Sequence, residues 1–507
     1  MTSILKCILI HGDNAMDYHI SKSRYCSAVQ CPKILWLKKN MPEEFDSSVV
    51  NQAVLDAGSA VGDLAMGLFG DFVEVPFGNL SDMVAKTKQL MDLQTPVIAE
   101  ASFSTDGLFC SVDILKVLND TEVELYEVKS STSVHDIYYH DAAFQYYVLS
   151  KLGYKVRICN IVHINNQYER NGELDIHELF TIKEVTADVI ALQHEVEANI
   201  RMLREYMKQI EEPEDDIGEH CFSPYPCGFF AYCSRHLPTP NIFQVAGART
   251  TTKLKCYRKG IVSFEDLNTC DLLSGAQYKQ IEHELFHYPP YIDKERIGEF
   301  MQTITYPLYF LDFESFQPAI PLYDHSHPYE QIVFQYSLHY IESEGGELKH
   351  KEFLAYPGED PRRKLAEQLC ADIPLDVCTT AYNMGFEKGR IRGIAELFPD
   401  LREHLMNIHD NIVDLMIPFQ KKWYYCRAMQ GSYSIKYVLP ALFPDDPALD
   451  YHNLEGIHNG GEASDAFAKM AAMTEGEIEK TREHLLKYCG LDTFAMVKVW
   501  EKLKEAI

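Results

Sequence analysis

Acidic side chains in the C-terminal part of the chain have the types needed to hold divalent cations. Asp312 and Glu314 are separated by one residue, and Glu387, Tyr488 and Asp492 follow much later. Two ions bound by such carboxylates hydrolyse a phosphodiester when one activates water and the other stabilises the leaving 3′ oxygen. A phenol beside them can position the water or help to deprotonate it. The competing interpretation of an isolated Asp-x-Glu pair is a solvated strand edge.

Another candidate centre lies between residues 100 and 150; because it comes earlier in the chain it is called the first centre, and the C-terminal acids form the second centre. Asp113 precedes Glu127 and Lys129, and Lys129 is two residues beyond Glu127, so both point to one face of a strand. Paired carboxylates there can hold Mg²⁺ or Mn²⁺, while the lysine orients the attacking water or stabilises charge on a phosphate. The alternative is an exposed hairpin whose acids and lysine form only surface ion pairs.

Four of the 14 cysteines have the spacing of a ligand set. Cys221, Cys227 and Cys233 are separated by five residues each, and Cys31 lies far upstream in a Cys-Pro segment. Four thiolates can complete a zinc site or hold an iron-sulfur cluster, although the short C-x2-C knuckle typical of structural zinc is missing. The alternative is a set of buried apolar thiols.

A basic and aromatic segment follows in the C-terminal part. Its charged and aromatic side chains alternate over a few positions: Lys421, Lys422, Trp423, Tyr424, Tyr425 and Arg427. Such a segment suits unpaired nucleotides through phosphate pairing and base stacking, and a core edge with flanking lysines explains it equally well.

The C-terminal acids are expected on strands and helices of an α/β unit. Residues 309–314 indicate a buried strand, and the alternation over 332–340 indicates a half-buried one. A turn at 344–346 leads into a third strand at 348–356, so we expect an antiparallel meander before helices begin near 361–369.

The first centre is expected on two adjacent strands. The sequence predicts a strand after Glu100, a turn at 106–107, a strand at 108–115 and a further strand at 124–129. Apolar residues at three- and four-residue steps also predict one long helix over 189–210, whose stripe belongs to the core.

Length and composition limit the class of protein. A chain of 507 residues is about three times a typical domain of ~150 residues, and 46% hydrophobic residues are ordinary for a globular protein. No apolar run reaches the ~18 residues of a membrane span, so we expect a cytoplasmic protein with no membrane association. The net charge of −28 argues against non-specific coating of nucleic acid but not against a nuclease.

These patterns divide the chain into three parts. We expect an N-terminal α/β domain over 16–235, a helical connector over 236–300 and a second α/β domain over 301–507. Residues 1–15 are expected to be an extension without function.

The segment around the first centre resembles the PD-(D/E)XK nucleases of the RecB-like kind, including the CRISPR-associated members. The resemblance assigns Glu100 before the strand pair and Gln145 on the following helix to the same site as Asp113, Glu127 and Lys129. This sequence departs from the family at two positions, where Gly62 replaces a metal-ligating His and Leu149 replaces a Tyr.

The cysteine arrangement resembles that of RecB-like nucleases with an iron-sulfur cluster. Those proteins have one cysteine in a Cys-Pro segment and three after the nuclease motifs, as at Cys31, Cys221, Cys227 and Cys233. The resemblance implies a structural [4Fe-4S] cluster that joins the two ends of the domain.

The C-terminal domain resembles the DEDD exonucleases of the DnaQ-like, ribonuclease H-like fold. Their motifs match Asp312 with Glu314, then Glu387, then the final Tyr-x3-Asp of Tyr488 and Asp492. Glu387 stands where the family has Asp, which leaves two reserve candidates, Asp414 and Asp465.

The combination resembles an uncharacterised bacterial family that fuses both nuclease types. It implies a metal-dependent nuclease with two active centres that acts on DNA, at ends or in single strands, using Mg²⁺ or Mn²⁺. No Gly-x4-Gly-Lys-Ser/Thr phosphate loop is visible, so unwinding would require a helicase partner, and a defence-system partner is also open. The alternative is a nucleic-acid-binding scaffold with one or both centres degenerate.

Overall fold

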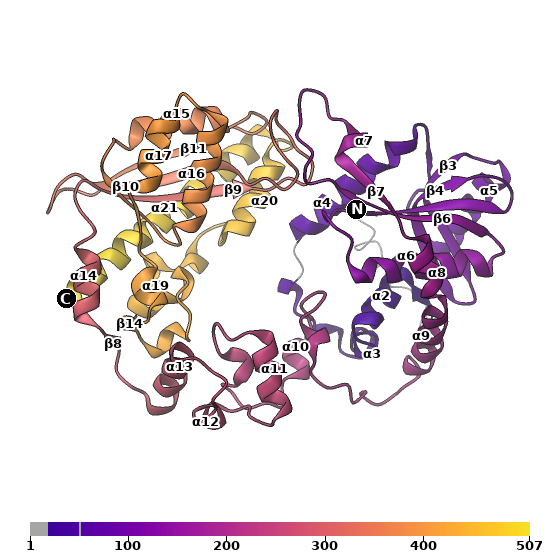
Figure 1. Cartoon of the computed structure of the whole chain (residues 1–507), viewed down its shortest axis with the longest axis horizontal. Helices are drawn as coiled ribbons and strands as arrows, with labels where there is room; N and C mark the ends of the chain where they lie inside the picture. Colours follow the sequence, from indigo (N-terminus) through magenta and orange to yellow (C-terminus); the bar gives the residue numbers. More distant parts are fainter. Residues whose placement is uncertain (1–18, 50–51) are drawn as a thin grey trace. The chain divides into compact units, whose positions relative to one another are not determined.

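The computed structural model describes residues 19–49 and 52–507 and is mixed α/β with several sheets (Figure 1). The expected extension at 1–15 lies outside these residues. The described chain forms two compact units. The first contains the residues up to His236 together with Ala319–Tyr329, and the second contains Leu237–Pro318 and Glu330–Ile507. None of the described helices is long and apolar enough to span a membrane.

The first unit is built on a seven-stranded sheet with the order β2-β3-β4-β5-β6-β7, in which β1 pairs with β4. Strands β3, β4 and β5 are antiparallel neighbours, and β6 is parallel to β5. The strands are β1 (Ile20–Ser21), β2 (Val73–Glu74), β3 (Val97–Thr105), β4 (Leu108–Val117), β5 (Glu122–Lys129), β6 (Lys155–Ile164) and β7 (Phe180–Glu184). The three strands expected around the first centre are confirmed.

Helices cover both faces of this sheet. Helices α2, α5, α6, α8 and α9 bury apolar residues on one face, whereas α4, α7 and Ala319 pack on the other. The helices are α2 (Lys22–Gln30), α3 (Lys33–Asn40), α4 (Gln52–Ala65), α5 (Leu80–Asp92), α6 (Asp136–Lys151), α7 (Ile176–Leu179), α8 (Thr186–Ala191), α9 (Gln193–Tyr206) and α10 (Phe230–Cys233).

Local sequence fixes the two turns that align β3, β4 and β5. Asp106 and Gly107 both adopt positive φ, the backbone of the two-residue hairpin turn that favours Asp-Gly. At the next turn the side chain of Asn119 accepts the backbone N–H groups of Thr121 and Glu122. The expected turn at 106–107 is therefore confirmed.

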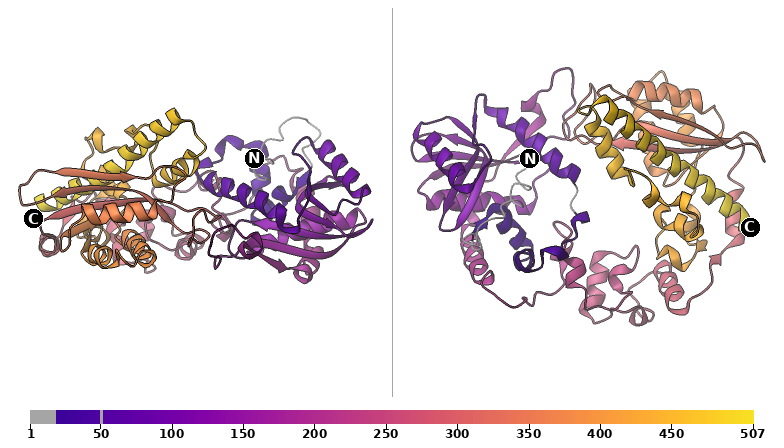
Figure 2. Two further views of the ribbon diagram at one scale, coloured as in Figure 1. Left: turned by 90° about the horizontal axis from the view of Figure 1, so that it is seen from above. Right: turned by 180° about the vertical axis from the view of Figure 1, so that it is seen from behind.

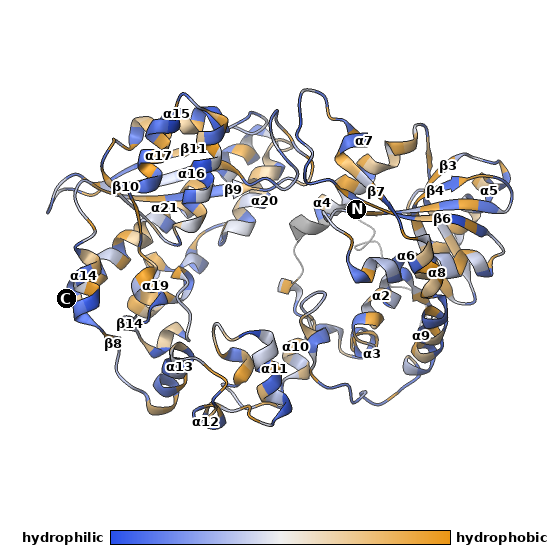
Figure 3. Ribbon diagram, in the orientation of Figure 1, coloured by the Kyte–Doolittle hydropathy of each residue, from blue (hydrophilic) through white to orange (hydrophobic). Residues whose placement is uncertain are grey.

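The single long helix expected over 189–210 is wrong in its extent. The chain forms two helices, α8 and α9, with a break at Leu192, and α9 ends at Tyr206. Ile210 is 92% exposed, because the apolar repeat continues beyond the last helical turn into a loop. Within α9 the repeat holds: hydrophobic and hydrophilic residues interleave (Figure 3), and Val196 and Leu203 are buried.

The second unit contains a five-stranded sheet with the order β11-β10-β9-β12-β13 and a two-stranded ribbon of β14 and β8. Strands β9, β10 and β11 form the expected antiparallel meander, and β12 and β13 continue in parallel with β9. The strands are β8 (Tyr291–Ile292), β9 (Leu308–Phe316), β10 (Ile332–Ile341), β11 (Lys349–Leu354), β12 (Cys378–Ala381), β13 (Ile412–Asp414) and β14 (Tyr424–Tyr425).

The helices of the second unit lie on both sides of its main sheet (Figure 2). Helices α15, α16 and α17 contribute apolar residues to one side, and α20 and α21 pack on the other. The helices are α11 (Thr250–Arg258), α12 (Phe264–Leu267), α13 (Gly275–Phe286), α14 (Lys294–Met301), α15 (Arg362–Asp372), α16 (Gly385–Leu397), α17 (Arg402–Asp410), α18 (Ile417–Gln420), α19 (Ile435–Leu442), α20 (Gly460–Met470) and α21 (Glu475–Glu505).

Alternation along β9 sorts its side chains between these two sides. Leu311 and Phe313 belong to the core beneath α15–α17, while Phe316 packs against Phe467 of α20. Because successive side chains point to opposite faces, Asp312 is directed to the side of α20 and α21. The expected half-burial of β10 is wrong, since helices on both sides bury almost the whole strand.

Candidate functional site

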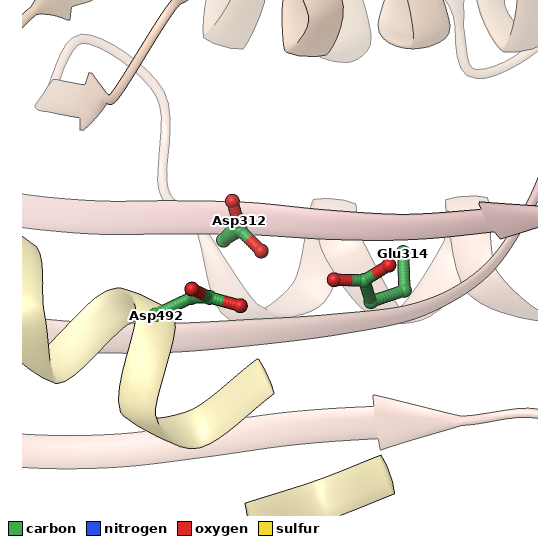
Figure 4. A group of neighbouring side chains, drawn as sticks. All are labelled: Asp312, Glu314 and Asp492. Carbon is green, nitrogen blue, oxygen red and sulfur yellow. The ribbon is translucent and has the colours of Figure 1, made fainter. Parts of the chain in front are cut away.

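Three carboxylates converge between β9 and α21. Asp312 and Glu314 project from one face of β9, and Asp492 projects toward them from α21 (Figure 4). One ligand oxygen of each lies within 4.8 Å of the others, which is close enough for a shared cation. The expectation that Asp312 and Glu314 share a face and approach Asp492 therefore agrees with the geometry.

Glu387 lies in the first turn of α16 and is buried, so the expected placement at a helix start is confirmed. Its atom Oε2 has no hydrogen-bond partner among the described residues. Burial, followed by repulsion from Asp414, raises the pKa of Glu387 to about 8. Asp414 accepts backbone N–H groups from Asn383, Met384 and Met416 at 2.9, 3.2 and 2.9 Å. Asp414 is thus a positioning residue for the start of α16.

Two phenols adjoin Asp492. Tyr451 Oη donates to Asp492 Oδ1 at 2.7 Å, and Tyr488 lies one helical turn before Asp492 in α21. Burial and the charges of the neighbouring carboxylates raise the pKa of both phenols well above the usual value. Tyr488 is therefore a hydrogen-bond donor at neutral pH and not a base.

Burial and mutual repulsion also raise the pKa values of the acids. For Asp312 burial is the largest cause, followed by the charges of the other three carboxylates. Burial raises the pKa of Glu314 well above its usual value and that of Asp492 to about 6, although nearby Lys436 opposes both shifts. In the described chain no lysine or arginine forms an ion pair with Asp312, Glu314, Glu387 or Asp492. Among the described residues the four acids have only the nearby charge of Lys436 and no ion-pair partner, so they fit a divalent cation.

The first centre is formed where β4 and β5 pair. Ile114 pairs with Tyr126 in the antiparallel register, so Asp113 stands directly opposite Glu127. Asp113 Oδ2 accepts the backbone N–H of Val128 at 2.7 Å. The two acids that sequence analysis paired are brought together, and both are largely buried.

Two lysines neutralise the acids of the first centre. Lys129 Nζ lies 2.7 Å from Glu127 Oε1 and 2.5 Å from Asp141 Oδ2. Lys22 Nζ lies 2.8 Å from Glu127 Oε1 and within 3.8 Å of oxygens of Asp113 and Asp141. Burial would lower the pKa of Lys22, but the three carboxylates together raise it well above its usual value.

Glu100 and Gln145 adjoin the same acids. Glu100 lies within β3, not before it, and its φ of 54° is rare for a residue inside a strand. The strand pairing on either side of Glu100 places it across from Asp113. Burial is the main cause of the raised pKa of Asp113, and the charge of Glu100 adds to it. Gln145 lies in the middle of α6, and its Nε2 donates to Glu127 Oε2 at 2.6 Å. Gly62 lies in α4, where an added Cβ would meet no atom within 4 Å.

The four predicted cysteine ligands come from two places in the first unit. Cys31 follows α2, and the other three lie between residues 219 and 233, where Cys233 ends α10. Burial raises the pKa of Cys31 to about 12, and the thiols of Cys221 and Cys227 add to the shift. Burial likewise raises the thiol pKa values of Cys221 and Cys227, and backbone hydrogen bonds oppose the shift at all three cysteines. Every cysteine in the described chain is a free thiol. Backbone donors facing neighbouring thiols fit an anionic cluster of sulfur ligands.

The basic and aromatic segment at 421–427 is mainly packed. Tyr424 and Tyr425 are buried in β14, and Lys422 is buried with its Nζ donating to the carbonyl of Gly431. The core-edge interpretation of this segment therefore describes these residues better than a nucleotide platform does.

Sequence analysis missed several groups at both centres. Asp141 lies four residues before Gln145, a helical spacing that could have revealed it. Lys22 and Tyr451 carry no such signal, because their partners Glu127 and Asp492 are distant in sequence.

Comparisons with known proteins cover part of the chain. Residues 309–434 match a family described as "Domain of unknown function (DUF2779)". The chain is 27% identical over 222 residues to "Uncharacterized protein UU173" of Ureaplasma parvum, which covers 39% of this chain and 31% of that protein. It is 25% identical over 206 residues to "Uncharacterized protein MG366" of Mycoplasma genitalium, covering 38% and 31%. The matches thus span about a third of the length of these curated relatives. No solved structure matches.

Proposed function

We propose that this chain is a metal-dependent nuclease that hydrolyses phosphodiester bonds of DNA, with its principal centre in the second unit. The proposal assigns that unit to the DEDD type of the ribonuclease H-like fold. Its main support is the approach of Asp312, Glu314 and Asp492, whose ligand oxygens lie within 4.8 Å of one another and form no ion pair with a basic residue in the part of the chain that the structure describes. The buried Glu387 oxygen without a hydrogen bond adds a fourth ligand candidate.

Each residue of this centre has a defined role in the proposal. Asp312, Glu314, Glu387 and Asp492 would hold Mg²⁺ or Mn²⁺, which supplies Lewis-acid stabilisation and a nucleophilic water when bound. Tyr488 remains protonated, because burial and the adjacent carboxylates raise its pKa, so it orients a water by donating a hydrogen bond. Tyr451 fixes the rotamer of Asp492 through its 2.7 Å hydrogen bond.

Residues at the start of α19 support a single-stranded substrate or a strand end. Tyr433 and Tyr437 are 41% and 45% exposed, and between them lies the exposed Lys436, whose charge acts on Glu314 and Asp492. Exposed aromatic rings stack on unpaired bases, and a lysine can pair with the phosphate that enters the centre. These residues take the role that sequence analysis considered for 421–427.

A second candidate function concerns the first unit, which we propose is a RecB-like PD-(D/E)XK nuclease domain with a [4Fe-4S] cluster on Cys31, Cys221, Cys227 and Cys233. Its support is the position of Asp113 opposite Glu127, with Lys129 on the same strand face. The competing function for the whole chain is a nucleic-acid-binding scaffold with degenerate centres.

A cleavage assay with one variant for each centre separates these functions. End-labelled single-stranded DNA, duplex DNA and RNA would be incubated with Mg²⁺ or Mn²⁺ and with the native chain, Asp312→Asn or Lys129→Ala. The exposed Asp445→Asn provides the matched control. We expect Asp312→Asn to reduce cleavage at least ~100-fold, because the centre loses a charged ligand. Binding without cleavage by the native chain would favour the scaffold. Cleavage unaffected by Asp312→Asn would show that the centre in the second unit is not responsible for the cleavage.

A further inference from the structure

The carboxylate of Glu127 has no acceptor site left for a cation. Its Oε1 accepts Lys22 Nζ at 2.8 Å and Lys129 Nζ at 2.7 Å, and its Oε2 accepts Lys22 Nζ at 3.1 Å and Gln145 Nε2 at 2.6 Å. An ionised carboxylate offers about four lone-pair positions. These four contacts therefore use the acceptor capacity of the side chain, which is only 1% exposed.

Lys22 contributes two of these four contacts and lies within 4 Å of three acids of the centre. Its ammonium nitrogen lies 3.8 Å from Asp113 Oδ1 and 3.7 Å from Asp141 Oδ1 in addition to its hydrogen bonds with Glu127. A single positive charge surrounded by three carboxylates is the arrangement that a bound metal ion would otherwise have. Lys129, in contrast, forms ion pairs with two of these acids, Glu127 and Asp141.

The backbone holds Lys22 firmly in this position. Lys22 is the first residue of α2, and the preceding β1 is anchored by the pairing of Ile20 with Leu108 and of Ser21 with Phe109. The Ser21 hydroxyl oxygen caps the helix by accepting the N–H of Arg24 at 3.2 Å. The side chain of Lys22 is buried, so its ammonium group cannot easily leave the centre for solvent.

We propose that Lys22 takes the place of the divalent cation at the first centre and keeps metal from binding to Asp113 and Glu127. The residues implied by the RecB-like resemblance therefore do not fit a metal ion while Lys22 is in place. The second centre differs because none of its four acids has a lysine or arginine partner in the described chain. This inference deepens the second candidate function: it makes the first centre a locked site that opens only when Lys22 is removed.

Mn²⁺ binding measured by electron paramagnetic resonance tests the lock without using activity. The starting protein is the full chain with Asp312→Asn and Asp492→Asn, which disable the second centre. We expect this protein to bind less than about 0.1 Mn²⁺ per chain at 100 µM Mn²⁺. The added Lys22→Met should create one Mn²⁺ site whose affinity is at least tenfold higher than that of any site in the starting protein. The control is Lys155→Met, which removes an exposed lysine paired with Glu122 at 2.9 Å and should create no site.

The outcomes are decisive even if Lys22→Met is poorly folded. Lys22→Gln then provides the same titration, because glutamine removes the charge while keeping a donor for Glu127. Stoichiometric binding by the starting protein with Lys22 present overturns the proposal without any further variant. A folded Lys22 variant that gains no site also overturns it. Failure of the proposed function is visible separately, as native chain that binds DNA but does not cut it.

Discussion

Replacement of Asp492 by asparagine should stabilise the second unit in the absence of divalent cations. Asp492 is buried beside Asp312 and Glu314, and none of the three forms an ion pair with a basic residue in the described chain, so its charge is unfavourable unless a cation is bound. Asparagine has the same shape and still accepts the hydrogen bond from Tyr451. The substitution removes the charge with little change in packing.

The expected size follows from the shifted pKa. Burial raises the pKa of Asp492 from 3.8 to about 6, which corresponds to at most roughly 3 kcal/mol at pH 8. Because the pKa is raised in the folded state, the folded unit is penalised as pH rises from about 4 through about 6. At pH 5 most Asp492 carboxyls are protonated in the folded state, and the penalty falls to between about 1 and 2 kcal/mol.

Scanning calorimetry in EDTA at pH 5 and pH 8 measures this effect. A stabilisation of ~3 kcal/mol in a unit of this size raises Tm by roughly 6–12 °C, and the increase should be about twice as large at pH 8 as at pH 5. Saturating Mn²⁺ should reverse the order of the two Tm values, so that the native chain unfolds at a higher temperature than Asp492→Asn. The native chain gains about 4 kcal/mol at a thousandfold excess over Kd, which exceeds the difference of ~3 kcal/mol in EDTA, whereas Asp492→Asn gains much less.

The control for this experiment is Asp445→Asn, which removes an exposed aspartate of the same unit. Its Tm should equal that of the native chain within a degree at both pH values. Equal Tm values for Asp492→Asn and the native chain in EDTA at pH 8 would refute the electrostatic reasoning. A Tm difference that does not grow between pH 5 and pH 8 would refute it as well.

Three further predictions address other parts of the molecule. Anaerobically purified protein should contain about four irons per chain, and zinc in colourless native protein would contradict the iron-sulfur cluster. Cys227→Ser should lose most of the iron, whereas the control Cys256→Ser, which replaces a buried cysteine outside the predicted ligand set, should retain it. Asp414→Ala should destabilise the second unit by at least ~2 kcal/mol in urea unfolding, because three backbone N–H groups lose their acceptor. The same substitution should weaken Mn²⁺ binding through Glu387, and unchanged stability would count against the positioning role of Asp414. Tyr437→Ala should weaken binding of single-stranded DNA by about 1–3 kcal/mol in fluorescence anisotropy with Ca²⁺, and unaltered affinity would remove α19 from the substrate path.

Sequence alone predicted the strands that carry both centres because short-range signals define them. Asp106-Gly107 and Asn119 specify the turns between β3, β4 and β5, and the one-residue spacing of Asp312 and Glu314 places both on one face of β9. The period of two along a strand needs no tertiary information. The break between α8 and α9 at Leu192 was not predictable in this way, because the apolar repeat continues across it.

The long-range contacts at each site could not be predicted from the sequence. Lys22 and Glu127 are 105 residues apart, and only the parallel pairing of β1 with β4 brings α2 over the acids. Tyr451 reaches Asp492 across 41 residues from a segment with no repeating pattern. A spacing rule identifies groups on one element, whereas these contacts depend on how separate elements pack.

The two carboxylate clusters solve one electrostatic problem in different ways, and this difference determines how each unit should depend on metal. Buried carboxylates are unfavourable without a counter-charge, and the first unit supplies the charge from Lys22 and Lys129. In the second unit the acids around Asp312 receive no such lysine, and the buried oxygen of Glu387 has no donor among the described residues. A unit that carries its own counter-charge gains nothing from added Mn²⁺, whereas one that lacks it gains the full binding free energy. Divalent cations should therefore raise the unfolding temperature of the second unit selectively, and a calorimetric trace in which both transitions move together would show that this division of charge is wrong.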